Sequence, residues 1–177
     1  MTKRFLLSAV ILAVMAGVAE AHPEGGHAAG FIHGFIHPLS GWDHITAMIS
    51  VGFFAASLGG RAKWLVPSAF VTMMVAGGAW AMAGMPLPFV ESGILASVFV
   101  LAGVALLRWN APLLGAMALC GFFAVFHGYA HGLEMPEDAA GITFASGFIL
   151  ATAILHGAGL VAGAIATHIW PRPVVKA

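Results

Sequence analysis

Long apolar segments separated by short polar stretches fill most of the chain after residue 40. This pattern predicts about five membrane-spanning helices, over residues 41–58, 64–83, 89–107, 112–129 and 141–169. With a rise of about 1.5 Å per residue, each segment crosses or nearly crosses a hydrocarbon core of about 30 Å. The last segment is long enough to be tilted or broken, and a break would come at His156-Gly157-Ala158-Gly159.

A shorter apolar piece, residues 28–36, precedes these spans and ends at Pro38. It is too short to cross a membrane, so we expect a half-helix or a re-entrant segment. Pro38 cannot donate a backbone hydrogen bond and Gly41 accepts unusual dihedral angles, which predicts a break in the chain there. The predicted fold class is therefore all-α: a polytopic membrane helix bundle of about five spans plus a short broken or re-entrant N-terminal helix.

The first residues of the chain have the features of a cleavable signal peptide. Two basic residues precede an apolar run over residues 5–18, and Ala19-Glu20-Ala21 then supplies a small-x-small cleavage pattern. The predicted domain organisation is a signal peptide over residues 1–21 and a single transmembrane domain over residues 22–177.

Composition agrees with a membrane protein. Hydrophobic residues make up 60% of the chain and charged residues only 8%, whereas a soluble domain carries about 25% charged residues. The net charge of zero gives no electrostatic support for a nucleic-acid partner. The single cysteine excludes an internal disulfide and a thiolate metal cluster. The sequence also has no phosphate-binding loop, so the chain itself cannot hydrolyse a nucleotide.

The basic residues after the signal peptide predict the orientation. If the mature N-terminus lies outside, all of them fall in cytoplasmic loops or in the C-terminal tail, as the positive-inside rule requires. These residues are Arg61, Lys63, Arg108, Arg172 and Lys176. We therefore expect a multi-pass protein of the bacterial inner membrane with a periplasmic mature N-terminus and a cytoplasmic C-terminus.

The stretch "FHGYAHGLE", residues 126–134, carries the clearest candidate chemistry. On a helix, His127, His131 and Glu134 project from one face, because residues three and four apart are neighbours. Two imidazoles and a carboxylate suit a divalent ion such as Ni²⁺, Co²⁺, Zn²⁺ or Fe²⁺ better than Ca²⁺ or Mg²⁺. A hydrogen-bonded packing role is the alternative for any single membrane histidine.

A second set of candidate ligands, His33, His37, Asp43 and His44, lies at the mouth of the first span. Its segment "HGFIHPL" matches "HGYAHGL" of the other cluster in the pattern H-G-aromatic-aliphatic-H-x-L. The match is either coincidence or the trace of two half-sites that face each other, as in transporters built from repeats.

The mature N-terminus offers one more candidate ligand set. His22 would carry a free amine after cleavage, and its amine and imidazole could bind a metal ion together with His27. A flexible polar tail is the alternative interpretation.

Two of these stretches resemble signatures of a known family. Residues 37–44, "HPLSGWDH", match H-x5-D-H, and residues 126–134 match F-H-G-x-A-H-G-x-E. The whole chain resembles the HupE/UreJ family of nickel and cobalt permeases. This resemblance implies uptake of Ni²⁺, in some members Co²⁺, across the inner membrane to supply hydrogenase or urease maturation. The functional positions that it implies are His37, Asp43, Phe70, Glu91, His131 and Glu134.

Two further residues are candidates for later steps of a transport path. His156 lies midway along the last predicted span, and a packing role is its alternative. Glu91 begins the third predicted span, where it could instead be a favourable charge at the positive end of a helix.

The predicted function is therefore transport of a transition-metal cation by a protein that is not an enzyme. The expected partners are the ion and the lipid bilayer. Ni(II) or Co(II) is cargo, and no permanent cofactor is expected. Passage is passive, ion-coupled or driven by a partner. Because neutral imidazole is the ligand, uptake should weaken as the pH falls through about 6.5.

Two other classes remain as alternatives. The two H-x3-H motifs would also suit a di-iron or zinc membrane metalloenzyme. A haem-binding membrane protein could use His44, His127 or His156 as axial ligands.

Overall fold

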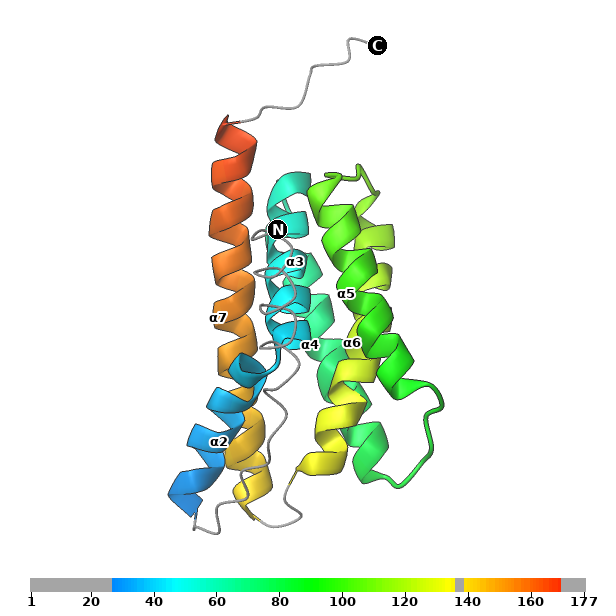
Figure 1. Cartoon of the computed structure of the whole chain (residues 1–177), viewed down its shortest axis with the longest axis vertical. Helices are drawn as coiled ribbons and strands as arrows, with labels where there is room; N and C mark the ends of the chain where they lie inside the picture. Colours follow the sequence, from blue (N-terminus) through cyan, green and yellow to red (C-terminus); the bar gives the residue numbers. More distant parts are fainter. Residues whose placement is uncertain (1–26, 136–138, 170–177) are drawn as a thin grey trace, which may run out of the picture.

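Helices form all the secondary structure that the computed structural model describes, over residues 27–135 and 139–169 (Figure 1). In chain order these helices are α2 (His27–Ser40), α3 (Trp42–Leu58), α4 (Ala62–Met82), α5 (Val90–Leu106), α6 (Leu113–Glu134) and α7 (Ala139–Ile169). The predicted signal peptide and His22 lie outside the described residues.

The predicted spans correspond one by one to α3 through α7. Their ends agree within two residues, except that α6 continues beyond residue 129 to Glu134. By length and composition, α4, α6 and α7 can each cross a membrane, and α5 is a shorter apolar helix. The helices α3 and α5 have 17 residues each and so reach about 26 Å. The fold is an all-α membrane helix bundle, as predicted.

The last predicted span is continuous, so of the two alternatives, tilted or broken, the break does not occur. α7 runs for 31 residues without interruption. Its glycines serve close packing instead: a side chain at Gly159 would collide with the backbone of Ile49 in α3. Small residues of this kind let membrane helices approach closely. The long, straight α7 lies along both α2 and α3 in Figure 1.

The break in the N-terminal part lies slightly later than predicted. α2 does not end at Pro38 but includes this proline in its final turn and ends at Ser40. Gly41 then adopts extended angles, with φ −99° and ψ 122°, before α3 begins. Since only the last turn follows Pro38, its missing N–H and its ring disturb little of the helix.

A second close pair consists of α4 and α6. A Cβ atom on Gly77 of α4 would collide with the backbone of Val125, and one on Gly128 of α6 would collide with that of Met74. The two helices therefore touch along their backbones. This packing fixes how α6 presents its histidines to the rest of the bundle.

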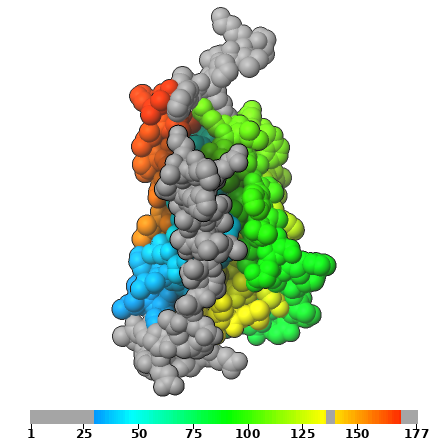
Figure 2. All heavy atoms as spheres, viewed as in Figure 1, coloured from blue at the N-terminus to red at the C-terminus, as the bar shows by residue number. Residues whose placement is uncertain are grey.

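Burial in the bundle is inverted relative to a soluble protein. Large apolar side chains such as Trp64, Phe99 and Leu114 are exposed on the outside, whereas His44, His127 and His156 are buried. An apolar exterior is what lipid requires, and polar groups inside such a bundle are rare and mark functional sites. Figure 2 shows α2 and the end of α6 at one end of the molecule, with the end of α7 at the other.

Candidate metal centre

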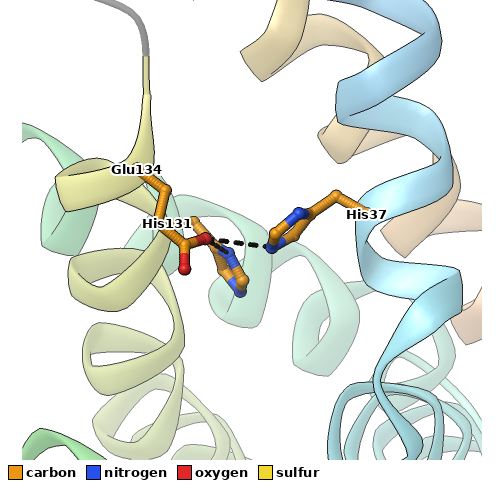
Figure 3. A group of neighbouring side chains, drawn as sticks. All are labelled: His37, His131 and Glu134. Carbon is orange, nitrogen blue, oxygen red and sulfur yellow. Dashed lines mark ion pairs between the residues drawn. The ribbon is translucent and has the colours of Figure 1, made fainter. Parts of the chain in front are cut away.

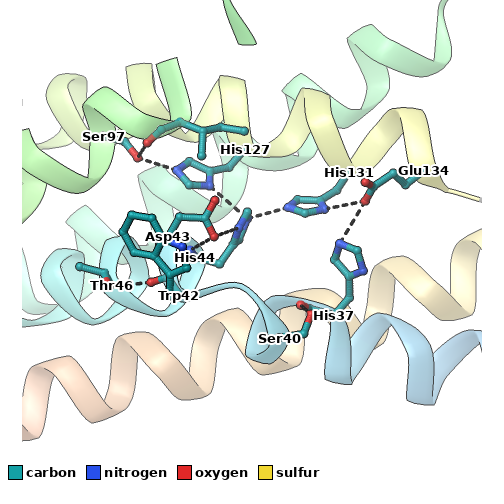
Figure 4. Close-up of polar contacts among 11 residues, drawn as sticks. His37, Ser40, Trp42, Asp43, His44, Thr46, Ser97, His127, His131 and Glu134 are labelled. Carbon is teal, nitrogen blue, oxygen red and sulfur yellow. Dashed lines mark hydrogen bonds and ion pairs between the residues drawn. The ribbon is translucent and has the colours of Figure 1, made fainter. Parts of the chain in front are cut away.

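The break at Gly41 turns two histidines toward α6. His37 lies in the last turn of α2 and His44 in the first turn of α3. Because Gly41 is extended, the two residues do not follow one helical phase, and both side chains point toward α6 (Figure 4). Ser40 closes the last turn of α2 by donating a hydrogen bond to the carbonyl of His37 at 2.6 Å.

Three imidazoles converge between α3 and α6, and we call His44, His127 and His131 the three-imidazole cluster. Nε2 of His44 lies 3.0 Å from Nδ1 of His127 and 2.6 Å from Nε2 of His131. The rings of His44 and His127 meet edge to face, with centroids 4.5 Å apart. Nitrogens bound to one first-row ion at about 2.1 Å lie roughly 3 Å apart in octahedral geometry, which is close to the spacing here.

A second set of candidate ligands adjoins the cluster on its exposed side. His37, His131 and Glu134 form this outer set, in which one ligand atom from each residue lies within 4.8 Å of the others (Figure 3). Oε2 of Glu134 lies 3.0 Å from Nε2 of His37 and 3.4 Å from Nδ1 of His131. His131 thus belongs to both sets, through a different ring nitrogen in each.

Ser97 of α5 fixes which nitrogen of His127 carries the proton. The Ser97 hydroxyl donates its hydrogen to the carbonyl of Ile94 at 2.6 Å. Its oxygen also lies 2.7 Å from Nε2 of His127, so it accepts a hydrogen bond from that nitrogen. A neutral imidazole carries one N–H, which leaves Nδ1 of His127 with a lone pair that points into the cluster.

Carboxylates favour the same arrangement on the other two rings of the cluster. Oδ1 of Asp43 lies 3.6 Å from Nδ1 of His44, and Glu134 adjoins Nδ1 of His131. A proton on each Nδ1 leaves both Nε2 atoms with lone pairs. Three lone pairs then face one another at 2.6 and 3.0 Å, an arrangement that repels unless a cation lies among them.

Asp43 lies beside the three-imidazole cluster and contacts two groups of His44. Its Oδ1 accepts a hydrogen bond from the backbone N–H of His44 at 2.8 Å, which satisfies one free donor at the start of α3. The same oxygen faces the ring of His44. Through these contacts Asp43 orients the imidazole that lies at the centre of the cluster.

Burial increases from the outer set to the cluster. Side-chain exposure falls from 57% at Glu134 and 36% at His37 to 12% at His131 and 7% at His44. His127 is completely buried. The candidate ligands therefore form a continuous row from the surface to the bundle interior (Figure 4).

Comparison with known proteins identifies a family for the chain. The sequence profile described as HupE / UreJ protein matches residues 10–176. The chain belongs to the HupE/UreJ family. Protein HupE of Rhizobium leguminosarum bv. viciae is a similar relative, with 43% identity over 143 residues, or 81% of this chain and 74% of that protein. No solved structure gives a significant match.

The two stretches that resemble HupE/UreJ signatures meet in the fold. The signature that begins at His37 crosses the break between α2 and α3, and the other forms the last turns of α6. The rings of His37 and His131 are 4.8 Å apart. The two H-x3-H motifs do not pair fully, since His127 contacts His44 and no contact joins it to His33 among the described residues.

Other predicted residues of this HupE/UreJ chain lie outside both sets. His33 is half-buried on α2, one turn before His37, and Glu91 is exposed in the first turn of α5. Phe70 and His156 lie deeper: the ring of Phe70 is fully buried and contacts both His127 and His156.

Sequence reasoning missed two contributors to this HupE/UreJ site. Ser97 is a single hydroxyl in an apolar span, and such residues commonly bond only to their own helix. Phe148 of α7 packs its ring 4.4 Å from that of His131 and 6.0 Å from that of His44. Its position in an apolar run gave no signal of this contact.

Proposed function

We propose that this protein is a permease that imports a divalent first-row transition-metal ion across the bacterial inner membrane. Ni²⁺ is the first candidate and Co²⁺ the second, and the ion would supply maturation of a metalloenzyme such as hydrogenase or urease. The ion is substrate, so the protein needs neither a permanent cofactor nor an enzymatic reaction of its own.

The observation that carries this proposal is that His131 belongs to two ligand sets of different burial. Because a neutral imidazole carries one N–H, His131 would bind an ion through Nδ1 in the outer set or through Nε2 in the three-imidazole cluster, one at a time. A resident metal is held by one set of ligands, closed or with a position open for substrate, whereas cargo needs successive sets that exchange ligands. Imidazole and carboxylate donors suit first-row divalent ions.

The charge distribution supports the direction of import. Arg61 and Lys63 lie where α4 begins and Arg108 where α5 ends, at the opposite end of the bundle from Glu134. By the positive-inside rule, these basic residues face the cytoplasm and the outer set faces the periplasm. The mature N-terminus is then periplasmic and the C-terminus cytoplasmic.

The contact between rings argues against a haem site. Axial imidazoles bind a haem iron from opposite faces of the macrocycle. His44 and His127 touch edge to face with nitrogens 3.0 Å apart, which leaves room for a small ion only.

Uptake of labelled Ni²⁺ into proteoliposomes that contain the purified protein tests the proposal. We expect entry that Co²⁺ blocks and Mg²⁺ does not. His131→Ala and Asp43→Ala should abolish entry while the protein remains folded. His168→Ala, at an exposed position near the end of α7, is the matched control and should transport normally.

Tight metal binding without entry would contradict a self-sufficient permease. Hydrolytic or oxidative activity of that metal-loaded protein would then identify a membrane metalloenzyme. Normal entry through both His131→Ala and Asp43→Ala would remove the proposed path itself.

A further inference from the structure

His156 on α7 is a buried histidine outside both ligand sets. Its side chain is 2% exposed, and neither ring nitrogen has a hydrogen-bond partner among the described residues. Thr152, one turn earlier, is completely buried and its hydroxyl is likewise without a partner in that part of the chain. Buried polar groups in native structures are nearly always paired, with protein, water or an ion, so two unpaired groups one turn apart mark a place for a bound water or ion.

The position of His156 continues the row of metal ligands. The buried residues Phe144, Phe148, Thr152 and His156 follow one another at one-turn intervals along α7. The first two contact the outer set and the cluster, since the rings of His37 and Phe144 are 5.8 Å apart and those of His131 and Phe148 are 4.4 Å apart. His156 lies two turns beyond Phe148, or about 12 Å further along the helix.

One aromatic ring connects the three-imidazole cluster to His156. The ring of Phe70 lies 6.0 Å from that of His127 and 5.2 Å from that of His156, where the two planes meet at 85°. Phe70 is fully buried on α4. Its ring therefore lies between the cluster and His156 and contacts both.

We propose that His156 and Thr152 form an inner binding station for the transported divalent ion, beyond the Phe70 ring. This inference rests on the proposed transport function and extends its path. The station offers one imidazole nitrogen and one hydroxyl oxygen, with water in the remaining positions. It has fewer and weaker ligands than the three-imidazole cluster, so it holds the ion loosely enough to release it.

Replacing His156 by leucine tests the station with the full chain in lipid nanodiscs. Co²⁺ serves as the probe, because its visible spectrum reports its ligands, and equilibrium dialysis counts bound ions. His156→Leu should lower the saturating number of Co²⁺ ions per chain by one and leave the tightest binding step unchanged. Ni²⁺ uptake into proteoliposomes should fall about tenfold or more. Thr152→Val should weaken the same binding step, and Thr167→Val, on the last turns of α7, is its control.

Thermal unfolding separates this role from packing. His156→Leu removes an unpaired buried polar group, so the variant should be at least as stable as the parent even though it transports poorly. If the leucine variant does not insert into membranes, His156→Asn keeps a polar side chain but is a poor ligand, and it should show the same losses.

Unchanged ion counts and wild-type uptake in His156→Leu would overturn the station and leave His156 as a packing residue or a water site. A parent protein that transports Ni²⁺ but never binds more than one ion would also overturn it. A parent protein that neither binds nor transports Ni²⁺ would instead defeat the proposed function.

Discussion

The Nε2 atoms of His44 and His131 lie 2.6 Å apart, although 87 positions separate the two residues in the chain. With carboxylates beside both Nδ1 atoms, each Nε2 presents a lone pair to the other. Such a pair is stable with either a proton or a metal ion between the nitrogens. Proton and metal therefore compete for the same place.

This competition predicts that Ni²⁺ binding releases protons. A proton that bridges His44 and His131 in the metal-free protein must leave when the ion arrives, so apparent affinity falls as the pH falls. The measurement is the acidification of a weakly buffered solution of the purified protein on addition of Ni²⁺. His44→Ala should lose this release, and His168→Ala should keep it. Affinity that is constant across the ordinary histidine range would contradict the proposed ligands.

Ser97→Ala should weaken metal binding although Ser97 is not a proposed ligand. The change leaves the Nε2–H of His127 without its acceptor and frees the ring to adopt the other tautomer, which turns N–H rather than a lone pair into the cluster. We expect Ni²⁺ affinity to fall by about 10- to 100-fold, as for other partners that orient metal ligands. Isothermal titration of Ser97→Ala against Ser92→Ala, an exposed position of the same helix, measures the difference.

Ser97→Thr keeps the hydroxyl and should restore most of the affinity. Equal affinity in Ser97→Ala and the parent protein would mean that the tautomer of His127 does not matter for binding.

The sequence predicted the helices, the candidate ligands that share one face of α6, and the break before α3. Apolar runs gave the spans, and the helical spacing of His127, His131 and Glu134 placed all three on one face of α6. The break at Gly41 followed from local backbone chemistry. These features depend on residues close together in the chain, so pattern alone was sufficient.

Contacts between helices could not be predicted in the same way. His44, rather than His33, meets His127 because the packing between helices sets how α3 lies against α6. Periodicity identifies the buried face of a helix but not its register against a neighbour. For the same reason periodicity could not show that Gly159, a possible place for a break in α7, is instead a contact with Ile49.

Glu134→Gln should impair capture of the ion more than its passage. Glu134 is the most exposed ligand, and its carboxylate contacts both His37 and His131. The amide keeps the size but loses the negative charge that attracts a cation. We expect a higher KM for Ni²⁺ uptake with a smaller change in the maximal rate, measured from initial rates in proteoliposomes. His127→Ala should mainly lower the maximal rate, because it removes a fully buried ligand. The reverse pattern would place Glu134 at a later step of the path.

Gly128→Ala should disturb the site through helix packing, without changing any ligand. A Cβ atom at position 128 would overlap the Met74 carbonyl on α4, and Gly128 lies between the ligands His127 and His131. Moving α6 away from α4 would cost about 1–3 kcal/mol, as other overpacked contacts do, and would displace both imidazoles. Thermal unfolding in detergent and Ni²⁺ uptake should both decline. Gly103→Ala is the matched control, because nothing lies within 4 Å of a Cβ atom at that position. If Gly128→Ala unfolds and transports like Gly103→Ala, backbone contact between α4 and α6 does not hold the metal ligands in place.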